Sequence, residues 1–228
     1  MIRKILVLLT LVGSLTISPI ASAVHLTQPQ FDALMDEFGV LTSYRAVASA
    51  EPLGILGFDV SLEGTSGTYQ GASLVLPKIK FQKGLIAGLD VAGYYSSFSV
   101  PGVNAATTGY GAALTYAIWD GSMVAPAWNI RGSYTSADVS GIVKTTTMGI
   151  DTSVSKGFGP VTPYIGIGTF NLTGSDLSGD GLADYNATKT RYFYGLSFDL
   201  LALNLTFEGD NTDGVSSYSV KAGIRIGD

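Results

Sequence analysis

The stretch SSYSVKAGIRIGD, residues 216–228, alternates between two kinds of side chain. From Tyr218 to Ile226 every second residue is apolar or aromatic, and the residues between them include Lys221 and Arg225. A period of two indicates a β-strand whose two faces have different surroundings. Which face lies inside decides what class of protein this is.

Residues 1–23 have the pattern of a secretory signal peptide. Arg3 and Lys4 give a basic start, residues 5–20 are almost uniformly apolar, and Ala21-Ser22-Ala23 matches a small-x-small cleavage site. A membrane-spanning helix is the alternative, but the apolar run is short for a span of ~20 residues. We therefore expect an exported protein that is cleaved after Ala23.

Composition narrows the class of the exported chain. It contains no Cys, so disulfides do not hold it together. The net charge of the full sequence is −5 and cleavage removes Arg3 and Lys4, so the exported chain carries −5 − 2 = −7. Without a basic stripe, this acidic balance argues against nucleic acid as a partner. After residue 23 no window approaches 18 consecutive apolar residues, although the mean hydropathy is +0.32 and 29 residues are Gly. An apolar exported chain without a hydrophobic helix is typical of a membrane β-barrel.

One segment after the signal peptide has a helical period. In TQPQFDALMDEFG, residues 27–39, the apolar side chains recur at helical spacing: Phe31, Leu34, Met35 and Phe38. Thr27 is a suitable N-cap and Gly39 is a suitable end. We expect an amphipathic helix over 28–38, followed by a linker, so that residues 24–53 precede a barrel domain of residues 54–228.

Alternation with a period of two replaces the helical period from Gly54 onward. It predicts ten strands, within a range of eight to twelve, near residues 55–64, 75–82, 85–97, 107–119, 126–135, 144–155, 160–171, 189–200, 202–208 and 216–226. Their lengths suit the ~9–11 residues that a tilted membrane strand needs. The predicted fold is all-β, an antiparallel up-and-down transmembrane β-barrel with a short N-terminal helix.

The predicted connections alternate in length. Short ones fall at 83–84, 120–122, 157–159 and near 201, and longer ones at 65–73, 98–106, 136–143, 172–188 and 209–215. Short periplasmic turns and longer outer loops are typical of outer-membrane barrels, and an even number of strands returns both barrel ends to the periplasmic side.

The chain resembles a small bacterial outer-membrane β-barrel over residues 54–226. The stretch ALMDEFGVLTSYRAVASAEPLGILGFDV, residues 33–60, resembles the lead-in of an uncharacterised family of predicted outer-membrane proteins, in which a short helix precedes the first strand. The resemblance implies a bacterial outer-membrane location and no known activity. The ending Ile226-Gly227-Asp228 departs from the terminal aromatic that the assembly machinery commonly reads in such barrels.

In a membrane barrel the apolar faces meet lipid and the charged faces line the lumen. Twelve charges fall on the polar faces: Asp59, Glu63, Lys78, Lys80, Asp90, Arg131, Asp151, Arg191, Asp199, Glu208, Lys221 and Arg225. Because unpaired buried charge is costly, we expect these groups to pair. Lys221 and Arg225 are expected to meet Asp59 and Glu63 where the last strand closes on the first.

Aromatic side chains at strand ends predict the membrane interfaces. Five tyrosines fall where strands meet the long connections, and Trp128 lies nearer the short turns; the tyrosines are Tyr95, Tyr110, Tyr134, Tyr192 and Tyr218. Amphipathic rings suit the headgroup level, so we interpret these residues as an aromatic girdle.

Little in the sequence favours catalysis or a cofactor. His25 is the only His and precedes the barrel, and no two carboxylates have a defined catalytic spacing, so we expect no enzyme and no cofactor. The acidic loop of residues 173–186 is a weak metal candidate through Asp176, Asp180 and Asp184, but its spacing does not match an EF-hand, so a solvated loop is preferred.

The amphipathic helix must bury its apolar face. It has three candidate positions: in the lumen as a plug, across the periplasmic mouth, or on the inner-leaflet interface. We expect it at or in the periplasmic end of the barrel, with its acidic side chains near lumen cations such as Lys78, Lys80, Lys221 or Arg225.

These expectations favour an outer-membrane barrel with a narrow, charge-lined lumen, either structural or a passage for small solutes. A surface binding or adhesion module acting through the long loops is the alternative, and a soluble periplasmic barrel that binds an apolar ligand is a weaker one. The expected partners are outer-membrane lipid and the barrel assembly machinery. The solute or surface ligand and the oligomeric state are left open.

Overall fold

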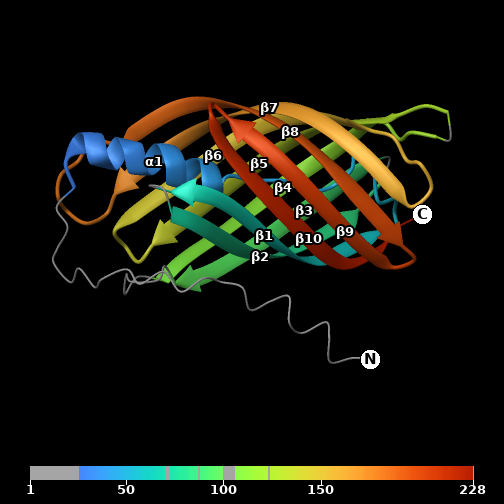
Figure 1. Ribbon diagram of the computed structural model, residues 1–228, viewed down its shortest axis with the longest axis horizontal. Coiled ribbons are helices and arrows are strands. Elements are labelled where there is room, and N and C mark those ends of the chain that lie inside the picture. Colours follow the sequence, from blue (N-terminus) through green and yellow to red (C-terminus); the bar gives the residue numbers. More distant parts are fainter. Residues whose placement is uncertain (1–25, 70–71, 87, 100–105, 123, 228) are drawn as a thin grey trace.

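A computed structural model describes residues 26–69, 72–86, 88–99, 106–122 and 124–227. The predicted signal peptide and His25 lie outside this part of the chain. Within it, ten antiparallel strands form a closed barrel in which each strand pairs with its neighbours in sequence and β1 pairs with β10 (Figure 1). The predicted fold class is confirmed.

The helix α1 (Gln28–Thr42) precedes the barrel, and residues 43–57 connect it to the first strand. The strands, in chain order, are β1 (Phe58–Tyr69), β2 (Ala72–Gly84), β3 (Leu89–Ser99), β4 (Ala106–Trp119), β5 (Ala127–Val139), β6 (Val143–Ser155), β7 (Val161–Asp176), β8 (Tyr185–Leu200), β9 (Leu203–Thr212) and β10 (Val215–Ile226).

The barrel has two unlike ends. At the helix end, strands meet through residues 70–71, 100–105, 140–142, 177–184 and 213–214; at the base end, β1 begins, β10 ends and strands meet through residues 85–88, 120–126, 156–160 and 201–202. The long connections expected at 65–73, 136–143 and 209–215 are wrong, because most of those residues belong to strands. Their Ser, Thr and Gly content hid strands whose outward side chains face water.

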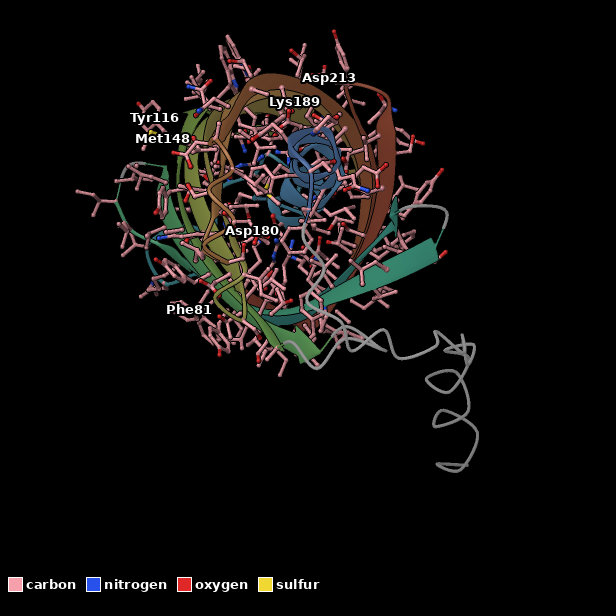
Figure 2. All side chains as sticks on the ribbon, turned by 90° about the vertical axis from the view of Figure 1, so that its left-hand side faces the viewer. Phe81, Tyr116, Met148, Asp180, Lys189 and Asp213 are labelled. Atoms are coloured by element: carbon pink, nitrogen blue, oxygen red, sulfur yellow. The ribbon has the colours of Figure 1, made fainter. Side chains whose placement is uncertain are left out.

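The outward face of the wall is an apolar band with a polar collar on one side. Outward residues such as Leu62, Leu114, Ile165 and Ile224 are exposed, and nearer the helix end the same strands carry outward polar residues, among them Ser66, Thr108, Asn171 and Ser216. Figure 2 shows Phe81, Tyr116 and Met148 outside the ring of strands. The apolar face of each strand therefore lies outside, the reverse of a water-soluble barrel.

The pairing of β2 with β3 is shorter than the other strand pairings. It ends at Ile79 opposite Tyr95, although both strands continue toward the helix end. Pro77 has no N–H to offer the next strand, and its carbonyl accepts a hydrogen bond from the Ser96 hydroxyl at 2.6 Å. A proline therefore ends the ladder at this point of the wall.

The helix begins after Thr27 as expected but does not end at Gly39. Gln30 Oε1 accepts hydrogen bonds from the Thr27 amide and hydroxyl, at 3.0 and 2.9 Å. The helix then continues to Thr42 because its last turn is buried in the barrel, where Val40 and Leu41 are fully covered. Among the described residues, no helix has the length and apolar content needed to cross a bilayer.

Candidate functional site in the barrel lumen

The lumen is filled by the N-terminal segment of the same chain. Residues 26–57, here called the plug segment, consist of α1 at the helix end and an extended stretch that runs through the lumen to the base end (Figure 1). Seen from the helix end, α1 lies inside the ring of strands (Figure 2). The helix thus lies in the lumen, which is one of the three candidate positions, at the end of the barrel opposite to the start of β1 and the end of β10. The expectation that this is the periplasmic end stays a prediction.

The apolar face of α1 packs on the wall near the helix end. Phe31 and Met35 are fully buried against Val143 of β6, and Leu34 and Leu182 pack around them. Deeper in the barrel, Val40 packs on Phe170 and Leu172 of β7. The helix therefore buries its apolar stripe inside the lumen, against apolar side chains of the wall.

Polar contacts hold the outer side of the helix at the mouth. Gln28 exchanges two hydrogen bonds with the main chain of Ala183, at 2.8 and 3.0 Å. Asp36 accepts hydrogen bonds from Lys189 and Tyr185 of β8. Burial raises the pKa of Asp36, but these donors outweigh it and lower the pKa below its usual value, so the carboxylate is charged at neutral pH. The expected contact with Lys78, Lys80, Lys221 or Arg225 is replaced by Lys189.

The extended stretch is anchored by a buried ion pair between Arg45 and Asp210 of β9. Arg45 Nε lies 2.8 Å from Asp210 Oδ2, and both side chains are fully buried. The guanidinium also donates to Ser217 Oγ at 2.9 Å and to the Leu41 carbonyl at 2.9 Å. These partners satisfy most of the donors of the fork, as a buried guanidinium requires.

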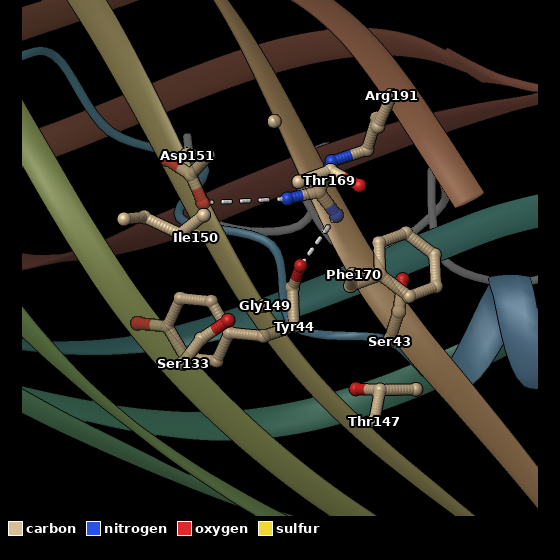
Figure 3. Close-up of a pocket in the computed structure, with 11 residues that line it drawn as sticks. Ser43, Tyr44, Ser133, Thr147, Gly149, Ile150, Asp151, Thr169, Phe170 and Arg191 are labelled. Carbon is tan, nitrogen blue, oxygen red and sulfur yellow. Dashed lines mark hydrogen bonds and ion pairs between the residues drawn. The ribbon is translucent and has the colours of Figure 1, made fainter. Parts of the chain in front are cut away.

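Side chains of the wall bind main-chain groups of the plug segment. Lys80 donates to the carbonyls of Arg45, at 2.9 Å, and of Ala46. Arg191 donates to the Tyr44 carbonyl while it pairs with Asp151 at 3.6 Å (Figure 3).

The same kind of contact continues toward the base end. Ser155 accepts from the Ala50 amide at 3.0 Å, Asn129 donates to the Ala50 carbonyl at 3.3 Å, and Asp90 accepts from the Leu53 amide at 3.2 Å. The lumen therefore holds an extended backbone along its length.

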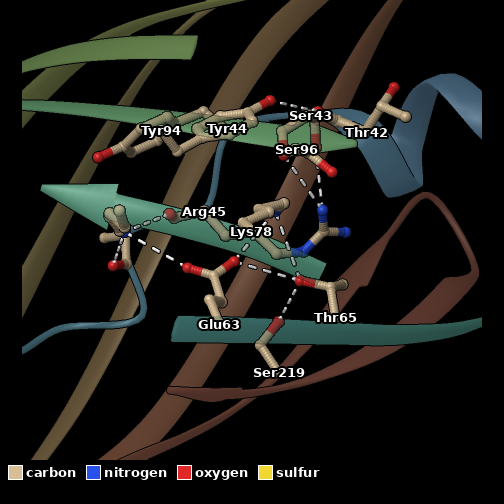
Figure 4. Close-up of polar contacts among 12 residues, drawn as sticks. Thr42, Ser43, Tyr44, Arg45, Glu63, Thr65, Lys78, Tyr94, Ser96 and Ser219 are labelled. Atoms are coloured by element: carbon tan, nitrogen blue, oxygen red, sulfur yellow. Dashed lines mark hydrogen bonds and ion pairs between the residues drawn. The ribbon is translucent and has the colours of Figure 1, made fainter. Parts of the chain in front are cut away.

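The remaining lumen charges pair within the wall. Glu63 lies 3.0 Å from Lys78 and 3.6 Å from Lys80, and Thr65 joins this group to Ser219 (Figure 4). Figure 3 also shows Asp151, which pairs with Arg131 as well as with Arg191. Six charges of the predicted set thus lie in two clusters on opposite parts of the wall.

The closing strands carry a third cluster. Asp59 of β1 pairs with Lys221 at 2.9 Å and with Arg225 at 3.1 Å, both on β10. Asp59 and Glu63 were both expected as partners of these cations, but Glu63 pairs instead with Lys78 and Lys80 on β2. Register does not decide this choice, because Glu63 lies opposite Lys78 on β2 and also opposite Lys221 on β10, and the Lys221 side chain reaches Asp59.

Three predicted lumen carboxylates have neutral partners, among them Asp90, which accepts from the Leu53 amide and from Gln82 Nε2. Glu208 accepts from the Tyr164 hydroxyl at 2.8 Å, and the half-exposed Asp199 accepts from Asn204 at 2.7 Å. All twelve predicted charges lie on inward-facing positions, and Asp199 and Arg225 near the base end are the half-exposed ones.

Three charged residues that contact the plug segment or belong to it are outside the predicted set: Arg45, Asp210 and Lys189. The predicted linker contains Arg45, and the predicted strand of residues 202–208 stops short of Asp210. Continued alternation of Glu208, Asp210 and Thr212 was the available signal, since all three are buried on the inward face. No periodic pattern marked Arg45.

The predicted girdle residues all lie on the outward face. Each is exposed, and the five tyrosines lie toward the polar collar while Trp128 lies near the base end; the tyrosines are Tyr95, Tyr110, Tyr134, Tyr192 and Tyr218. Tyr95 and Tyr110 face each other across β3 and β4.

The three aspartates of the acidic loop are not arranged as a metal site. Among the described residues, no group of three or more His, Cys, Asp or Glu side chains is arranged to hold a metal ion. Asp176 instead accepts hydrogen bonds from the amide and hydroxyl of Ser178, at 2.9 and 2.6 Å. The Asp176 side chain therefore organises the loop that meets the start of α1.

Free space in the barrel is uneven. A cavity of about 10 Å³ lies beside Tyr44, Asp151 and Arg191, which is room for one water molecule (Figure 3). A much larger cavity of about 580 Å³ opens at the base end, lined in part by Glu51, Asp120 and Asp199. Passage from this basal cavity to the helix end is therefore obstructed by the plug segment.

Among known proteins, the matches to this chain are solved structures of β-barrels. No family model and no curated protein sequence matches the chain. Among solved structures, the KdgM porin in complex with disordered oligogalacturonate is 10% identical with a TM-score of 0.38, covering 74% of this chain and 98% of that one. Neisserial surface protein A is 12% identical with a TM-score of 0.35, covering 75% and 96%.

A third match is the β domain of the Bordetella autotransporter BrkA, which is 8% identical with a TM-score of 0.44, covering 75% of this chain and 98% of that one. These matches assign no family. No residue role is carried from them to this chain.

Proposed function

We propose that this chain is an outer-membrane β-barrel whose lumen is kept closed by its own N-terminal segment, and that small solutes pass only when that segment is displaced. The observation that carries the proposal is the buried Arg45–Asp210 pair inside a wall whose outward face is apolar. On this proposal the partners are membrane lipid and the barrel assembly machinery.

The outward band supports a membrane location. A closed barrel leaves no unpaired strand edge along most of its wall, which is the condition for crossing lipid with strands. Exposed side chains such as Leu62, Leu114 and Ile165 would cost free energy in water, whereas lipid accepts them. The alternative of a soluble barrel with an apolar interior requires the opposite arrangement of faces.

The contacts of the plug segment support closure. Buried cations of the wall donate hydrogen bonds to main-chain carbonyls of residues 44–46. Without the plug segment, these cations would face an aqueous pore. These contacts and the Arg45–Asp210 pair hold residues 44–46 against the wall together, although Arg191 Nε has no hydrogen-bond partner among the described residues. A passage for solutes through the lumen therefore requires the plug segment to move.

A charge on the outward band tests the membrane location. Leu114→Arg places a cation in the apolar part of β4, where such a charge costs about 2–4 kcal/mol near the bilayer midplane. We expect a matching loss in the free energy of unfolding from lipid vesicles, measured by urea titration. Thr108→Arg, outward in the polar collar of the same strand, is the control and should cost about 0–1 kcal/mol. Equal costs for the two variants would contradict the membrane location.

Conductance of the unmodified chain tests closure. The expected result in a planar bilayer is insertion, shown by recovery of folded protein with the membrane, without steady ionic current. A steady current from the wild-type chain would show that the lumen conducts around the plug segment, and the proposal of closure would then be wrong.

A further inference from the structure

The plug segment begins and ends at opposite mouths of the barrel. At the helix end, Gln28 is bonded to Ala183 in the connection between β7 and β8. At the base end, the Gly84 amide donates to the Gly57 carbonyl at 3.0 Å, and β1 begins at the next residue. In chain order, the plug segment therefore runs through the whole lumen and is followed by the first strand.

Along this path, side chains of the wall contact the main chain of the plug segment more often than its side chains. Tyr94, Lys80, Arg191 and Asn129 all donate to main-chain carbonyls between Thr42 and Ala50. Arg45 is the side chain of the extended stretch that the wall holds by charge. The occupant for which this lumen is built is therefore an extended polypeptide.

The two mouths also differ in their surroundings. Near the helix end the outward residues are polar, as at Ser97, Thr108 and Asn211. Connections at both mouths expose apolar side chains, Ile86, Val124, Phe158 and Leu201 at the base end and Ile142 and Leu177 at the helix end, so the mouths differ in their strands. The polar collar carries the wall beyond the apolar band at the helix end.

We propose that the lumen is a channel for a polypeptide and that it displays the chain's own N-terminal end on the outer face of the membrane, while both ends of the barrel wall lie at the inner face. The connections do not distinguish the mouths by length, but the first residue of β1 and the last residue of β10 both lie at the base end. An outer-membrane barrel with an even number of strands returns both wall ends to the periplasmic side, so the helix end is the outer one. This inference rests on the proposed outer-membrane location and adds which side each mouth faces.

Cysteine labelling tests the sidedness, because the chain has no Cys of its own. Ala33 is exposed on α1 at the helix end, and Ala202 is exposed in the base-end connection between β8 and β9. Ala33→Cys and Ala202→Cys are therefore matched substitutions at opposite mouths. Each full-length variant is produced in Gram-negative cells and treated with a bulky maleimide that does not cross the outer membrane, before and after that membrane is permeabilised.

We expect the Ala33→Cys protein to react fully on intact cells and the Ala202→Cys protein to react only after permeabilisation. Folding of both is checked by the shift in gel mobility on heating that a closed barrel shows. Reaction of Ala33→Cys only after permeabilisation would overturn the inference, whether or not Ala202→Cys reacts earlier.

Failure of the underlying proposal has a different signature. If the protein is recovered in the soluble fraction without detergent, the outer-membrane location itself is wrong. If it stays with the outer membrane but the labelling pattern is reversed, the location stands and only the display of the N-terminal end is wrong.

Discussion

Asp210→Ala is expected to give steady ionic current through a barrel that is silent in its wild-type form. The substitution leaves the Arg45 guanidinium buried without its carboxylate, since the Asp210 side chain is its ion-pair partner at 2.8 Å. Breaking a buried pair by removing one partner costs about 3–5 kcal/mol. The plug segment can avoid that cost by leaving the lumen, whereas the hydrogen-bonded wall stays intact.

The measurement is single-channel conductance in planar bilayers, with gel mobility before and after heating as the check on folding. Asp184→Ala, an exposed aspartate of the 177–184 connection, is the control and should remain silent. Replacing both partners, with Arg45→Met and Asp210→Leu, removes the buried charge and should restore silence, because an apolar pair of similar volume is tolerated.

Two results would contradict this account. One is a folded Asp210→Ala barrel that stays silent, which would mean that the pair does not hold the plug segment. The other is current from the double variant equal to that of Asp210→Ala, which would point to loss of the residues themselves and not to unpaired charge.

Gly84→Ala is expected to destabilise the protein where the plug segment joins the wall. A Cβ at Gly84 would lie 1.8 Å from the Gly54 carbonyl oxygen, a main-chain atom that cannot turn aside as a side chain does. Relief requires the turn at residues 53–57 to move, and overpacking of this kind costs about 1–3 kcal/mol. The free energy of unfolding in urea, followed by tryptophan fluorescence in lipid vesicles, measures the loss.

Gly132→Ala is the matched control for this substitution. Gly132 also lies in a strand, but a Cβ added there has nothing within 4 Å. The two Gly→Ala changes remove the same conformational freedom from the unfolded chain, so their difference reports the contact with Gly54. Equal stability of the two variants would show that the joint between plug segment and wall is loose.

The period of two in the sequence predicted the strands well because it reflects one physical requirement. Each strand has one face toward lipid and one toward a crowded polar interior, so every register position along β10, from Tyr218 to Ile226, carries the expected kind of side chain. The same reasoning placed twelve charges on inward positions. It was weakest at the helix end, where outward residues such as Ser97 and Ser216 meet water and the contrast between faces disappears.

The sequence left the position of the helix open among three alternatives for a different reason. An amphipathic pattern states that a stripe is buried but not against what, and Phe31 and Met35 would suit a lipid interface or either mouth of the barrel. The wall offers an apolar surface inside the lumen at Val143, Phe170 and Leu172, far apart from the helix in sequence. Such a match exists only after the barrel has closed.

By itself, the sequence predicted about ten strands, the sidedness of the wall and the apolar band, because these follow from local alternation and from the need to satisfy every backbone group in lipid. Tertiary structure alone decided that the lumen is filled and that Arg45 meets Asp210. Those residues are 165 positions apart, and only the closure of β10 on β1 brings the wall around the extended stretch so that one isolated cation finds its carboxylate.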